Sequence, residues 1–498
     1  MVNYKLGLKD VVHLSFITFG MVMFGLLAGK YYLRGDTQEL EFSSERFGRL
    51  SSETGWYGIY FKGQKIGYSE SMTAHQDSTL VVTDRTYMTF SMLGRQQRVD
   101  SYTRAVTDDS LRLISFVFSI SSEESDFGVR GRVEENDLVL QITTAGETRD
   151  ERVKLEGPPQ LPSTVSLLFS EEEFEPGKRF STTVFDPGSL ANVPLIIEVI
   201  GRESITHGGR EVQVWHLQEN MLNMLVDTYV DDEGQMLEER SQMGYRVVLE
   251  DERTAVSDSL FNRAVDINQL VSIKPDRLIP ENDRIVRLKV RLNGVGSDTL
   301  GMRGGNQTYR DNVLEIFSRM PDSMALRDTV PVRIRESYTL PSAFIQSEHP
   351  RLLALASEIV DLNDSAPARI NSILEWMSGN LEKKPTFSIP NTLEVLERGS
   401  GDCNEFAVLF CSLARAASIP TRVAMGLVYL DGAFYYHAWC ECYLGAWVPV
   451  DPIFEQFPAD ATHLRVLAGD MDRQVEILPL VGNLEISVIE WETAQGEI

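Results

Sequence analysis

Apolar residues follow three different patterns along the chain, and each pattern predicts a different kind of element. The first is a nearly unbroken apolar run from Val11 to Gly29, interrupted only by a few uncharged or weakly polar positions. Such a run is long enough to cross a bilayer as a helix. Residues 1–35 are therefore expected to be a short tail and an N-terminal transmembrane helix.

The same apolar run also fits a secretory signal. Its last residues, Leu26 to Gly29, include the small side chains that signal peptidase requires. Anchor and cleaved signal both remain open. In either case the short N-terminal tail favours a body on the far side of the membrane.

The second pattern is alternation of apolar and polar residues over residues 36–255, as in the runs 57–62 and 66–71. A period of two is typical of half-buried strands. Turn sequences at 63–65, 134–137, 208–209 and 231–234 separate several of these runs. We expect an antiparallel β meander, a twisted sheet curled into a sandwich or partial barrel, that serves as a spacer or partner-binding module or holds an apolar ligand on a concave face.

Residues 256–339 read as a linker followed by a second strand-rich segment, with strands expected at 285–292 and 330–335. Several glycines lie between these two runs. They lack the strand before and the helix after them that a nucleotide-binding loop requires. No nucleotide site is expected there.

The third pattern, helical periodicity, appears in the final segment, residues 340–498. Helices are expected at 347–361, at 366–380, at 392–398 with Thr392 as the cap and Gly399 as the end, and from Cys403 to a point before Ile419. Strands are expected at 422–429, 433–443, 446–450, 475–478 and 484–490. The fold class is therefore α+β, with a large antiparallel β-rich region followed by a mixed C-terminal domain.

The candidate chemistry begins with Cys403, which follows a Gly-Ser-Gly turn and opens the expected helix. A free thiol has a pKa of about 8.5 and reacts as the thiolate. The dipoles at a helix N-terminus favour that negative charge. The backbone N–H of Cys403 would also point towards the oxygen of a bound acyl group and donate half of an oxyanion hole.

His437 and Asp451 supply the partners that such a thiol needs. Strand alternation places His437, Trp439 and Glu441 on one face and Cys440 and Cys442 on the other. A hairpin would bring Asp451 back beside His437, where a carboxylate fixes the tautomer of an imidazole. Each residue alone reads as an ordinary core or turn residue, but together they have the order of nucleophile, base and orienting acid.

Composition limits the classes of partner. The net charge of −26 argues against nucleic acid, because phosphate binding needs clustered Lys and Arg. The four cysteines all lie between residues 403 and 442, too few for a disulfide scaffold. One bridge among Cys411, Cys440 and Cys442 stays open if the compartment is oxidising.

The segment 340–490 resembles the transglutaminase-like superfamily, which shares a papain-like core. The residues that support the resemblance are Gly401-Asp402-Cys403-Asn404-Glu405, Ile419-Pro420-Thr421-Arg422, Tyr436-His437-Ala438-Trp439 and Trp447-Val448-Pro449-Val450-Asp451-Pro452. The membrane-anchored or exported bacterial members are the most similar, and the stretch from Gln456 to His463 fits them too. We therefore expect a single-pass protein of the bacterial inner membrane, with its body periplasmic or extracellular.

The resemblance implies a catalytic triad of Cys403, His437 and Asp451 that performs acyl transfer on protein or peptide amides. Asn391 is a candidate for a second oxyanion donor, or only a turn residue before a helix. Trp439 would line the acyl pocket or simply cover the sheet. Neither a cofactor nor a metal is expected, because the calcium sites of animal relatives have no match here and Cys440 with Cys442 lacks the further ligands of a zinc site.

Two functions follow from these observations. The first is a cysteine-dependent transglutaminase, peptidase or deamidase acting on a protein or peptide substrate at the cell envelope. The alternative is a non-catalytic, membrane-anchored binding or assembly protein that keeps the papain-like scaffold and contacts a partner protein through its β-rich region. The sequence leaves open the substrate, the choice of amine or water as acyl acceptor, and the oligomeric state.

Overall fold

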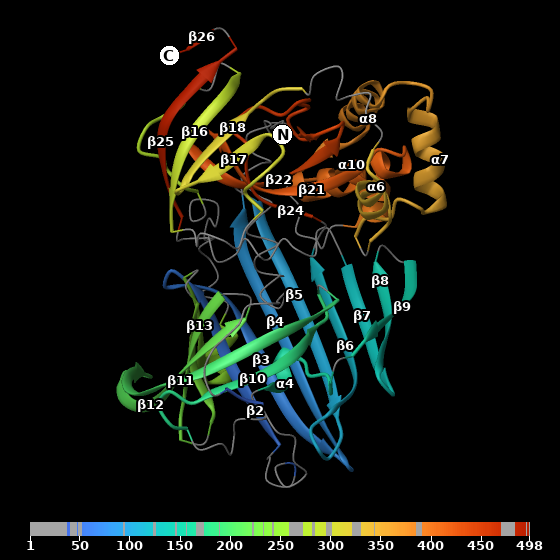
Figure 1. Cartoon of the computed structure of the whole chain (residues 1–498). Helices are drawn as coiled ribbons and strands as arrows, with labels where there is room; N and C mark the ends of the chain where they lie inside the picture. The colour runs from blue at the N-terminus through green and yellow to red at the C-terminus, as the bar shows by residue number, and fades with distance from the viewer. Residues whose placement is uncertain are drawn as a thin grey trace, which may run out of the picture. The chain divides into compact units, whose positions relative to one another are not determined.

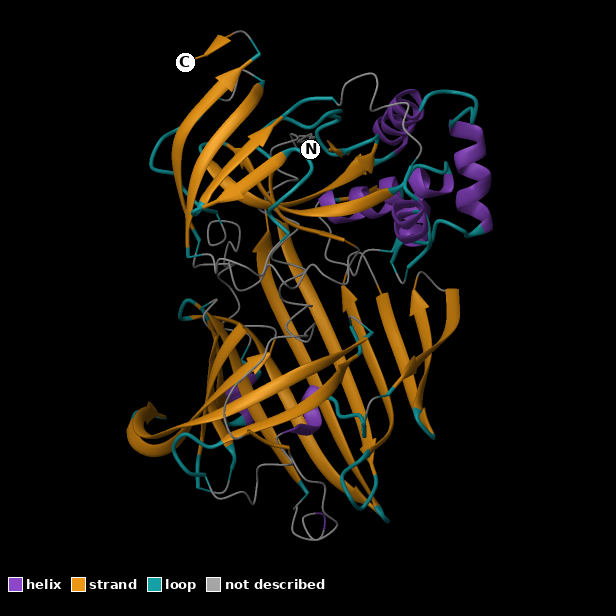
Figure 2. Cartoon of the chain, viewed as in Figure 1, coloured by secondary structure: helices purple, strands orange, loops and turns teal. Residues whose placement is uncertain are grey.

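A computed structural model gives the fold. It describes residues 37–39, 47, 52–92, 95–122, 126–144, 147–155, 157–165, 174–188, 190–221, 224–232, 234–241, 244–257, 272–280, 284–294, 301–320, 330–342, 344–384, 391–469, 484–494 and 496–497. The described residues up to 257 belong to one compact unit and those from 272 onwards to a second. Strands make up nearly all of the regular structure of the first unit, whereas the second also holds several longer helices (Figure 2).

The first unit is built on one sheet of 15 strands. Its strands are β1 (Thr37–Glu39), β2 (Glu53–Phe61), β3 (Gln64–Gln76), β4 (Thr79–Met92), β5 (Arg95–Thr107), β6 (Leu113–Ser122), β7 (Asp126–Glu134), β8 (Asp137–Thr144), β9 (Glu147–Lys154), β10 (Arg179–Asp186), β11 (Ala191–His207), β12 (Arg210–Met221), β13 (Met224–Val230), β14 (Met236–Ser241) and β15 (Tyr245–Glu250). Two one-turn helices, α4 (Pro162–Val165) and α5 (Glu252–Ala255), accompany them.

The order of strands in this sheet is that of a meander. From one edge it runs β1, then β10 to β15, then β2 to β9. Every neighbouring pair is antiparallel except β1 with β10. The expected turns at 63, 135, 208–209 and 234 all have the positive φ angles that tight hairpins need. The prediction of an antiparallel β meander is confirmed.

The sheet also curls back on itself. The segment after β9 forms a parallel bridge from Gln160 to Val184 of β10, at the opposite end of the sheet. The rings of Phe116 on β6 and Phe185 on β10 lie 5.7 Å apart. Residues such as Phe185 and Leu140 are completely buried, so the core lies inside this curl.

The C-terminal unit combines two larger sheets and a two-stranded one with a group of helices (Figure 1). Its strands are β16 (Ile285–Asn293), β17 (Gln307–Arg310), β18 (Val313–Phe317), β19 (Glu382–Lys383), β20 (Ser400–Gly401), β21 (Thr421–Leu430), β22 (Ala433–Tyr443), β23 (Trp447–Val450), β24 (Leu464–Gly469), β25 (Glu485–Thr493) and β26 (Gly496–Glu497). Its helices are α6 (Val332–Tyr338), α7 (Pro350–Ile359), α8 (Ala366–Asn380), α9 (Thr392–Arg398) and α10 (Cys403–Ala416).

One sheet of this unit has the order β23-β22-β21-β24 and is packed against α10. The other has the order β17-β18-β16-β25-β26, so β16 pairs with a strand nearly 200 residues further along the chain. A buried arginine of the first sheet also contacts the segment that precedes β17. Arg465 of β24 contacts Glu441 of β22, and its Nη2 donates to the carbonyl oxygen of Gly304, 2.8 Å away.

The helices and strands around Cys403 have nearly the predicted bounds, but two local predictions are corrected and one strand is new. The segment 330–335 was expected to be a strand, but 332–338 is helix α6, which has no buried residue and begins after Pro331. The cap of α9 is Asn391 instead of Thr392. Strand β24 was not predicted at all.

Two other predictions concern residues that the structure does not describe. The expected membrane helix at 11–29 lies outside the described residues, as does the expected strand at 475–478. Within the described parts of the chain, no helix has both the length and the apolar character needed to cross a membrane. The division of the chain into four parts stays a prediction.

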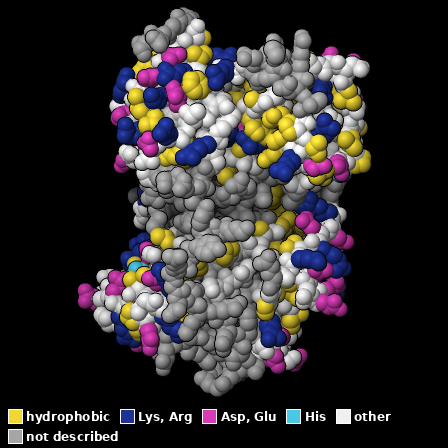
Figure 3. Space-filling view, viewed as in Figure 1, with side chains coloured by type: hydrophobic (Ala, Val, Ile, Leu, Met, Phe, Trp, Pro, Cys, Tyr) yellow, Lys and Arg dark blue, Asp and Glu magenta, His cyan; other side chains and the backbone are white. Residues whose placement is uncertain are grey.

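The visible surfaces of both units mix acidic and basic side chains. In Figure 3, Lys and Arg lie beside Asp and Glu over much of the viewed face. Several ion pairs of this kind are exposed, for example Arg152 with Glu134. On this face the coloured acidic side chains are not gathered into one region.

Candidate active site

A capping box places Cys403 at the start of α10. The side chain of Asp402 accepts from the backbone N–H of Asn404 at 2.9 Å, and Glu405 Oε2 accepts from the N–H of Asp402 at 3.0 Å. A Cβ on Gly401 would lie 2.4 Å from the Cβ of Glu405, so this box requires glycine there. The sequence Gly-Asp-Cys-Asn-Glu therefore begins the helix and sets the thiol in its first turn.

The two acids of this box share one buried site. Burial, and then the neighbouring Glu405, raises the pKa of the Asp402 carboxyl well above its usual range. The raised pKa lessens the negative charge that this cap places beside Cys403.

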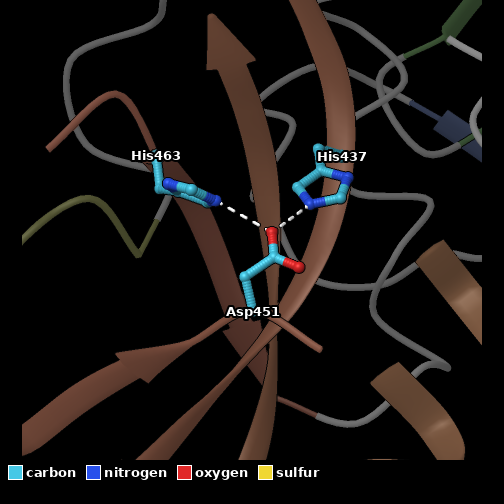
Figure 4. Close-up of side chains that lie close together, drawn as sticks. All are labelled: His437, Asp451 and His463. Carbon is cyan, nitrogen blue, oxygen red and sulfur yellow. Dashed lines mark hydrogen bonds and ion pairs between the residues drawn. The ribbon is translucent and has the colours of Figure 1, made fainter. Parts of the chain in front are cut away.

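The hairpin of β22 and β23 places Asp451 beside His437. Cys440 of β22 pairs with Val450 of β23, and Asp451 is the next residue. The carboxylate is held from behind, because its Oδ1 accepts from the N–H groups of Ile453 at 2.7 Å and Phe454 at 2.9 Å. Its Oδ2 is left to face the imidazoles (Figure 4).

His437 Nε2 and Asp451 Oδ2 are 2.6 Å apart. An ionised carboxylate can only accept, so Nε2 carries the hydrogen and donates. In the neutral ring the other nitrogen, Nδ1, then has the free lone pair. Nδ1 is buried and has no hydrogen-bond partner among the described residues. Such a nitrogen is suited to take a proton from a neighbouring acid.

The thiol lies against the strand that carries this imidazole. The backbone N–H of Ala438, the residue after His437, donates to Cys403 Sγ at 3.3 Å. The structure thus brings together the three predicted residues from α10, β22 and the end of β23. All three side chains have an exposed fraction of 0%. The sulfur is therefore not accessible to solvent in this conformation.

His463, just before β24, is a fourth member of the group that sequence reasoning did not single out. Its Nε2 lies 2.9 Å from Asp451 Oδ2, so one carboxylate oxygen faces two imidazoles (Figure 4). Its Nδ1 lies 3.1 Å from the carbonyl oxygen of Asp460 and 3.3 Å from Asp460 Oδ1. The only signal in the sequence was that the stretch ending at His463 fits the same subgroup as the motifs.

The charges of the group follow from these contacts. Burial lowers the pKa of His437, although Asp451 opposes the shift. Burial would raise the pKa of Asp451, but the two histidines hold it well below its usual range. Burial also opposes a charge on His463, but hydrogen bonds to Asp451 and Asp460 raise its pKa to about 10. At neutral pH the group consists of a neutral His437, an ionised Asp451 and a protonated His463.

Asn391 and Trp439 were the two further residues predicted for the oxyanion hole and the acyl pocket. Asn391 Oδ1 accepts from the N–H of Leu393 at 3.1 Å and so caps α9. Trp439 is buried, and its ring stacks on His437 with centroids 5.9 Å apart. The oxyanion role of Asn391 and the pocket role of Trp439 stay predictions.

The other three cysteines are free and buried. Cys440 Sγ donates to the carbonyl oxygen of Ala407 in α10, which confirms that this side chain faces away from the side of His437. Burial raises the pKa of Cys442 to about 12 and that of Cys440 well above its usual value. Cys440 and Cys442 are therefore small core groups whose thiols stay protonated at neutral pH.

His437, Asp451 and His463 are also the residues that could hold a metal ion, since their ligand atoms lie within 4.8 Å of one another. Figure 4 shows the carboxylate oxygen between the two ring nitrogens. A cation would need that central position for itself, with the three ligand atoms around it. In the structure Asp451 Oδ2 itself takes this position and accepts a hydrogen bond from each of the two rings.

Comparisons with known proteins agree with the sequence motifs. Residues 353–452 match the family model described as the transglutaminase-like superfamily. The match contains Cys403, His437 and Asp451 and stops before His463. No curated protein matches the chain significantly.

Solved structures give only weak likenesses. A β-barrel-like protein with a domain of unknown function, DUF1849, from Brucella abortus is 13% identical with a TM-score of 0.32, covering 41% of this chain and 99% of its own. A provisionally assigned cysteine protease from Cytophaga hutchinsonii is 16% identical with a TM-score of 0.28, covering 41% and 81%. At these TM-scores neither likeness supports an inference. On the family match and the motifs together, residues 353–452 of this chain are a domain of the transglutaminase-like superfamily.

Proposed function

We propose that the C-terminal unit is a cysteine-dependent acyltransferase or amidohydrolase that acts on protein or peptide amides through Cys403, His437 and Asp451. The observation that supports this most is the buried Nδ1 of His437, which has no partner among the described residues. Asp451 fixes the other nitrogen of that ring, and the backbone N–H of the next residue, Ala438, donates to the Cys403 sulfur. A buried nitrogen without a partner costs free energy. A catalytic base explains that cost.

The reaction would run in two halves. His437 Nδ1 takes the proton of the Cys403 thiol, and the sulfur attacks the carbonyl carbon of the amide. The tetrahedral intermediate collapses as the C–N bond breaks, and the imidazolium returns the proton to the departing amine. Water or a second amine, deprotonated by the same Nδ1, then attacks the thioester and releases Cys403.

Thiol labelling tests this proposal. A small electrophile such as iodoacetamide, at pH 7 and with sites read by mass spectrometry, should alkylate Cys403 at least about tenfold faster than Cys411, Cys440 and Cys442, because a thiolate is the reactive form. His437→Ala should remove that preference. Cys411→Ser is the control, because the serine hydroxyl can replace the thiol as the donor to the Thr421 carbonyl oxygen. This variant should leave the labelling of Cys403 unchanged.

A turnover assay complements the labelling. A library of glutamine-containing peptides, with and without a fluorescent primary amine, distinguishes amine transfer from release of ammonia or a peptide amine. Products that depend on both Cys403 and His437 would support the proposal. Equal alkylation rates for all four cysteines together with no turnover would overturn it.

The complete burial of the Cys403 sulfur favours a second function. In that case the papain-like core is a scaffold of a non-catalytic binding or assembly protein, and the β-rich unit contacts a partner protein. Complementation separates the two functions. If Cys403→Ala fully restores a deletion phenotype, chemistry is dispensable and the binding function is the right one.

We also propose that the body of the protein lies on the outer side of a bacterial inner membrane, held by residues 11–29. The support is the apolar run and the short tail before it. A reporter that is active only in an oxidising compartment, fused after Ile498, should be active. An active cytosolic reporter at the same position would contradict this location.

A further inference from the structure

His463 forms hydrogen bonds on both sides of its ring, and this distinguishes it from His437. One nitrogen faces a carboxylate oxygen of Asp451, and the other faces the carbonyl oxygen and the carboxylate of Asp460. All of these groups are acceptors. Only the imidazolium form has a hydrogen on both nitrogens, so the contacts themselves require a positively charged ring.

We propose that His463, backed by Asp460, is a positioning residue for the triad: its fixed positive charge holds the Asp451 carboxylate ionised and in place and keeps His437 neutral and ready to accept a proton. This inference rests on the proposed function. It adds a residue outside the segment that matches the superfamily model.

Asp451 can be held in this way because each of its oxygens has a separate task. Oδ1 accepts from the backbone N–H groups of Ile453 and Phe454. Oδ2 accepts from both histidines. The carboxylate therefore cannot rotate without losing several contacts, and it presents the same oxygen to His437 throughout.

The charge of His463 also limits how strongly Asp451 attracts a proton onto His437. A lone carboxylate next to an imidazole favours the imidazolium. Here the negative charge of Asp451 is already balanced by His463, which in turn is balanced by Asp460. His437 thus remains a base in the resting site and becomes charged only when it takes the proton of Cys403.

The surroundings make this charge effective. The titratable groups that contact the His463 ring are Asp451 and Asp460, and the His437 ring lies 5.8 Å away. The neighbouring Trp439 and Phe454 rings, at 5.3 and 6.0 Å, are uncharged. The next buried charges on β22 and β24, Glu441 and Arg465, pair with each other. Because His463 and Asp451 are buried away from water, the charge of His463 acts on its neighbours more strongly than it would in solvent.

Histidine titration in the full chain tests the inference without relying on turnover. The chain has seven histidines, and ¹³C labelling at Cε1 resolves them by NMR. We expect the His463 signal to stay in its protonated form at pH 8 and the His437 signal to be neutral at pH 7. His463→Gln, which can still donate to Asp451 but has no charge, should raise the titration midpoint of His437 by about one unit or more.

Two further variants make the test decisive. Asp460→Asn keeps His463 but removes its second carboxylate, so it should lower the midpoint of His463 and raise that of His437 by a smaller amount. This variant also serves if His463→Gln does not fold. His75→Gln, an exposed position on β3 of the other unit, should leave His437 unchanged.

The outcomes separate this inference from the proposed function. If His463 titrates near 6.5, or if the midpoint of His437 stays fixed in a folded His463→Gln or Asp460→Asn chain, His463 does not position the base, whatever the activity. If the midpoints move as expected and Cys403 still shows no chemistry, the proposed function fails alone. Where turnover is measurable, the acid limb of kcat/KM should move upward with the midpoint of His437.

Discussion

Asp451 is the residue on which most of the site depends, since it accepts from two imidazoles and from two backbone N–H groups. Replacing its carboxylate by an amide changes little in shape but reverses one hydrogen bond. An Asn side chain that turns its NH₂ towards His437 Nε2 would force the ring hydrogen onto Nδ1. The base would then have no lone pair for the thiol.

We therefore expect Asp451→Asn to lower kcat by about 10⁴-fold, the effect of the wrong tautomer in a comparable triad. The measurement is turnover of whichever peptide amide the wild-type chain accepts. Asp431→Asn, an exposed turn position between β21 and β22 with φ near 48°, is the matched control and should keep full activity. A decrease of less than tenfold for Asp451→Asn would contradict the assigned tautomer.

At this scale the sequence revealed three members of the group but not the fourth. Cys403, His437 and Asp451 could be predicted because each lies at the end or on a defined face of an element whose pattern is clear. His463 lies in irregular chain between β23 and β24, where no periodicity tells which way a side chain points. Its role depends on the fold bringing that chain back against Asp451.

Among the elements, β24 positions His463 because it pairs with β21 immediately after that residue. Gly426 of β21 makes the pairing possible. A Cβ at this position would lie 1.9 Å from the carbonyl oxygen of Leu464, a backbone atom that cannot move away cheaply. The contact explains why a glycine occurs inside a buried strand.

We expect Gly426→Ala to separate β24 from β21 and to destabilise the chain by about 2 kcal/mol or more, within the range for overpacked sites. Thermal unfolding measures it. Gly379→Ala is the control, and it should stabilise the chain. Gly379 lies in α8, where a Cβ would meet nothing within 4 Å. Alanine is more favourable than glycine inside a helix by about 1 kcal/mol. Equal effects of the two substitutions would argue against the strand pairing.

The elements predicted well are those with a consistent pattern and clear ends. Helix α9 ends at Gly399, whose φ of 67° is the left-handed conformation expected at that position. By contrast, 330–335 alternates like a strand, and its helix α6 has no buried face that a pattern could reveal. Strand β24 contains a buried Arg465, and only the fold shows that Glu441 balances this charge.

At the scale of the whole molecule, the β-rich unit contains two glutamates whose pKa values are raised by burial. Glu219 on β12 and Glu239 on β14 lie on either side of β13, and Thr228 of β13 donates to Glu219 Oε1 at 2.9 Å. Burial, and then the charge of Glu219, raises the pKa of Glu239 from 4.5 to about 8. Deprotonating Glu239 therefore destabilises the folded unit.

The sign of the pH dependence follows. A folded-state pKa above the unfolded value gives a stability contribution that is present below about pH 4.5 and is lost as the pH rises through about 8. We expect Glu239→Gln to raise Tm at pH 9 and to change it little at pH 5, as measured by calorimetry. Glu211→Gln, exposed on β12, should have no such pH dependence. An equal gain in Tm at pH 5 and pH 9 would contradict the raised pKa of Glu239.

The sequence predicted that residues 36–255 form a β meander, but not how its strands are ordered. A period of two identifies strands without saying which of them become neighbours. The pairing of β15 with β2 and the return of residue 160 to β10 depend on long-range contacts. The same is true of the pairing between β16 and β25.

That last pairing has a consequence for biosynthesis. Because β16 lies at 285–293 and its partner β25 at 485–493, the sheet that contains both cannot close until the ribosome has made the segment that carries β25. The 15-stranded sheet is complete after residue 250 and can fold on the emerging chain long before. A chain caught between these two points of synthesis would therefore have its first unit folded while β16 still lacked its partner strand, so the two units would acquire their final form at different times.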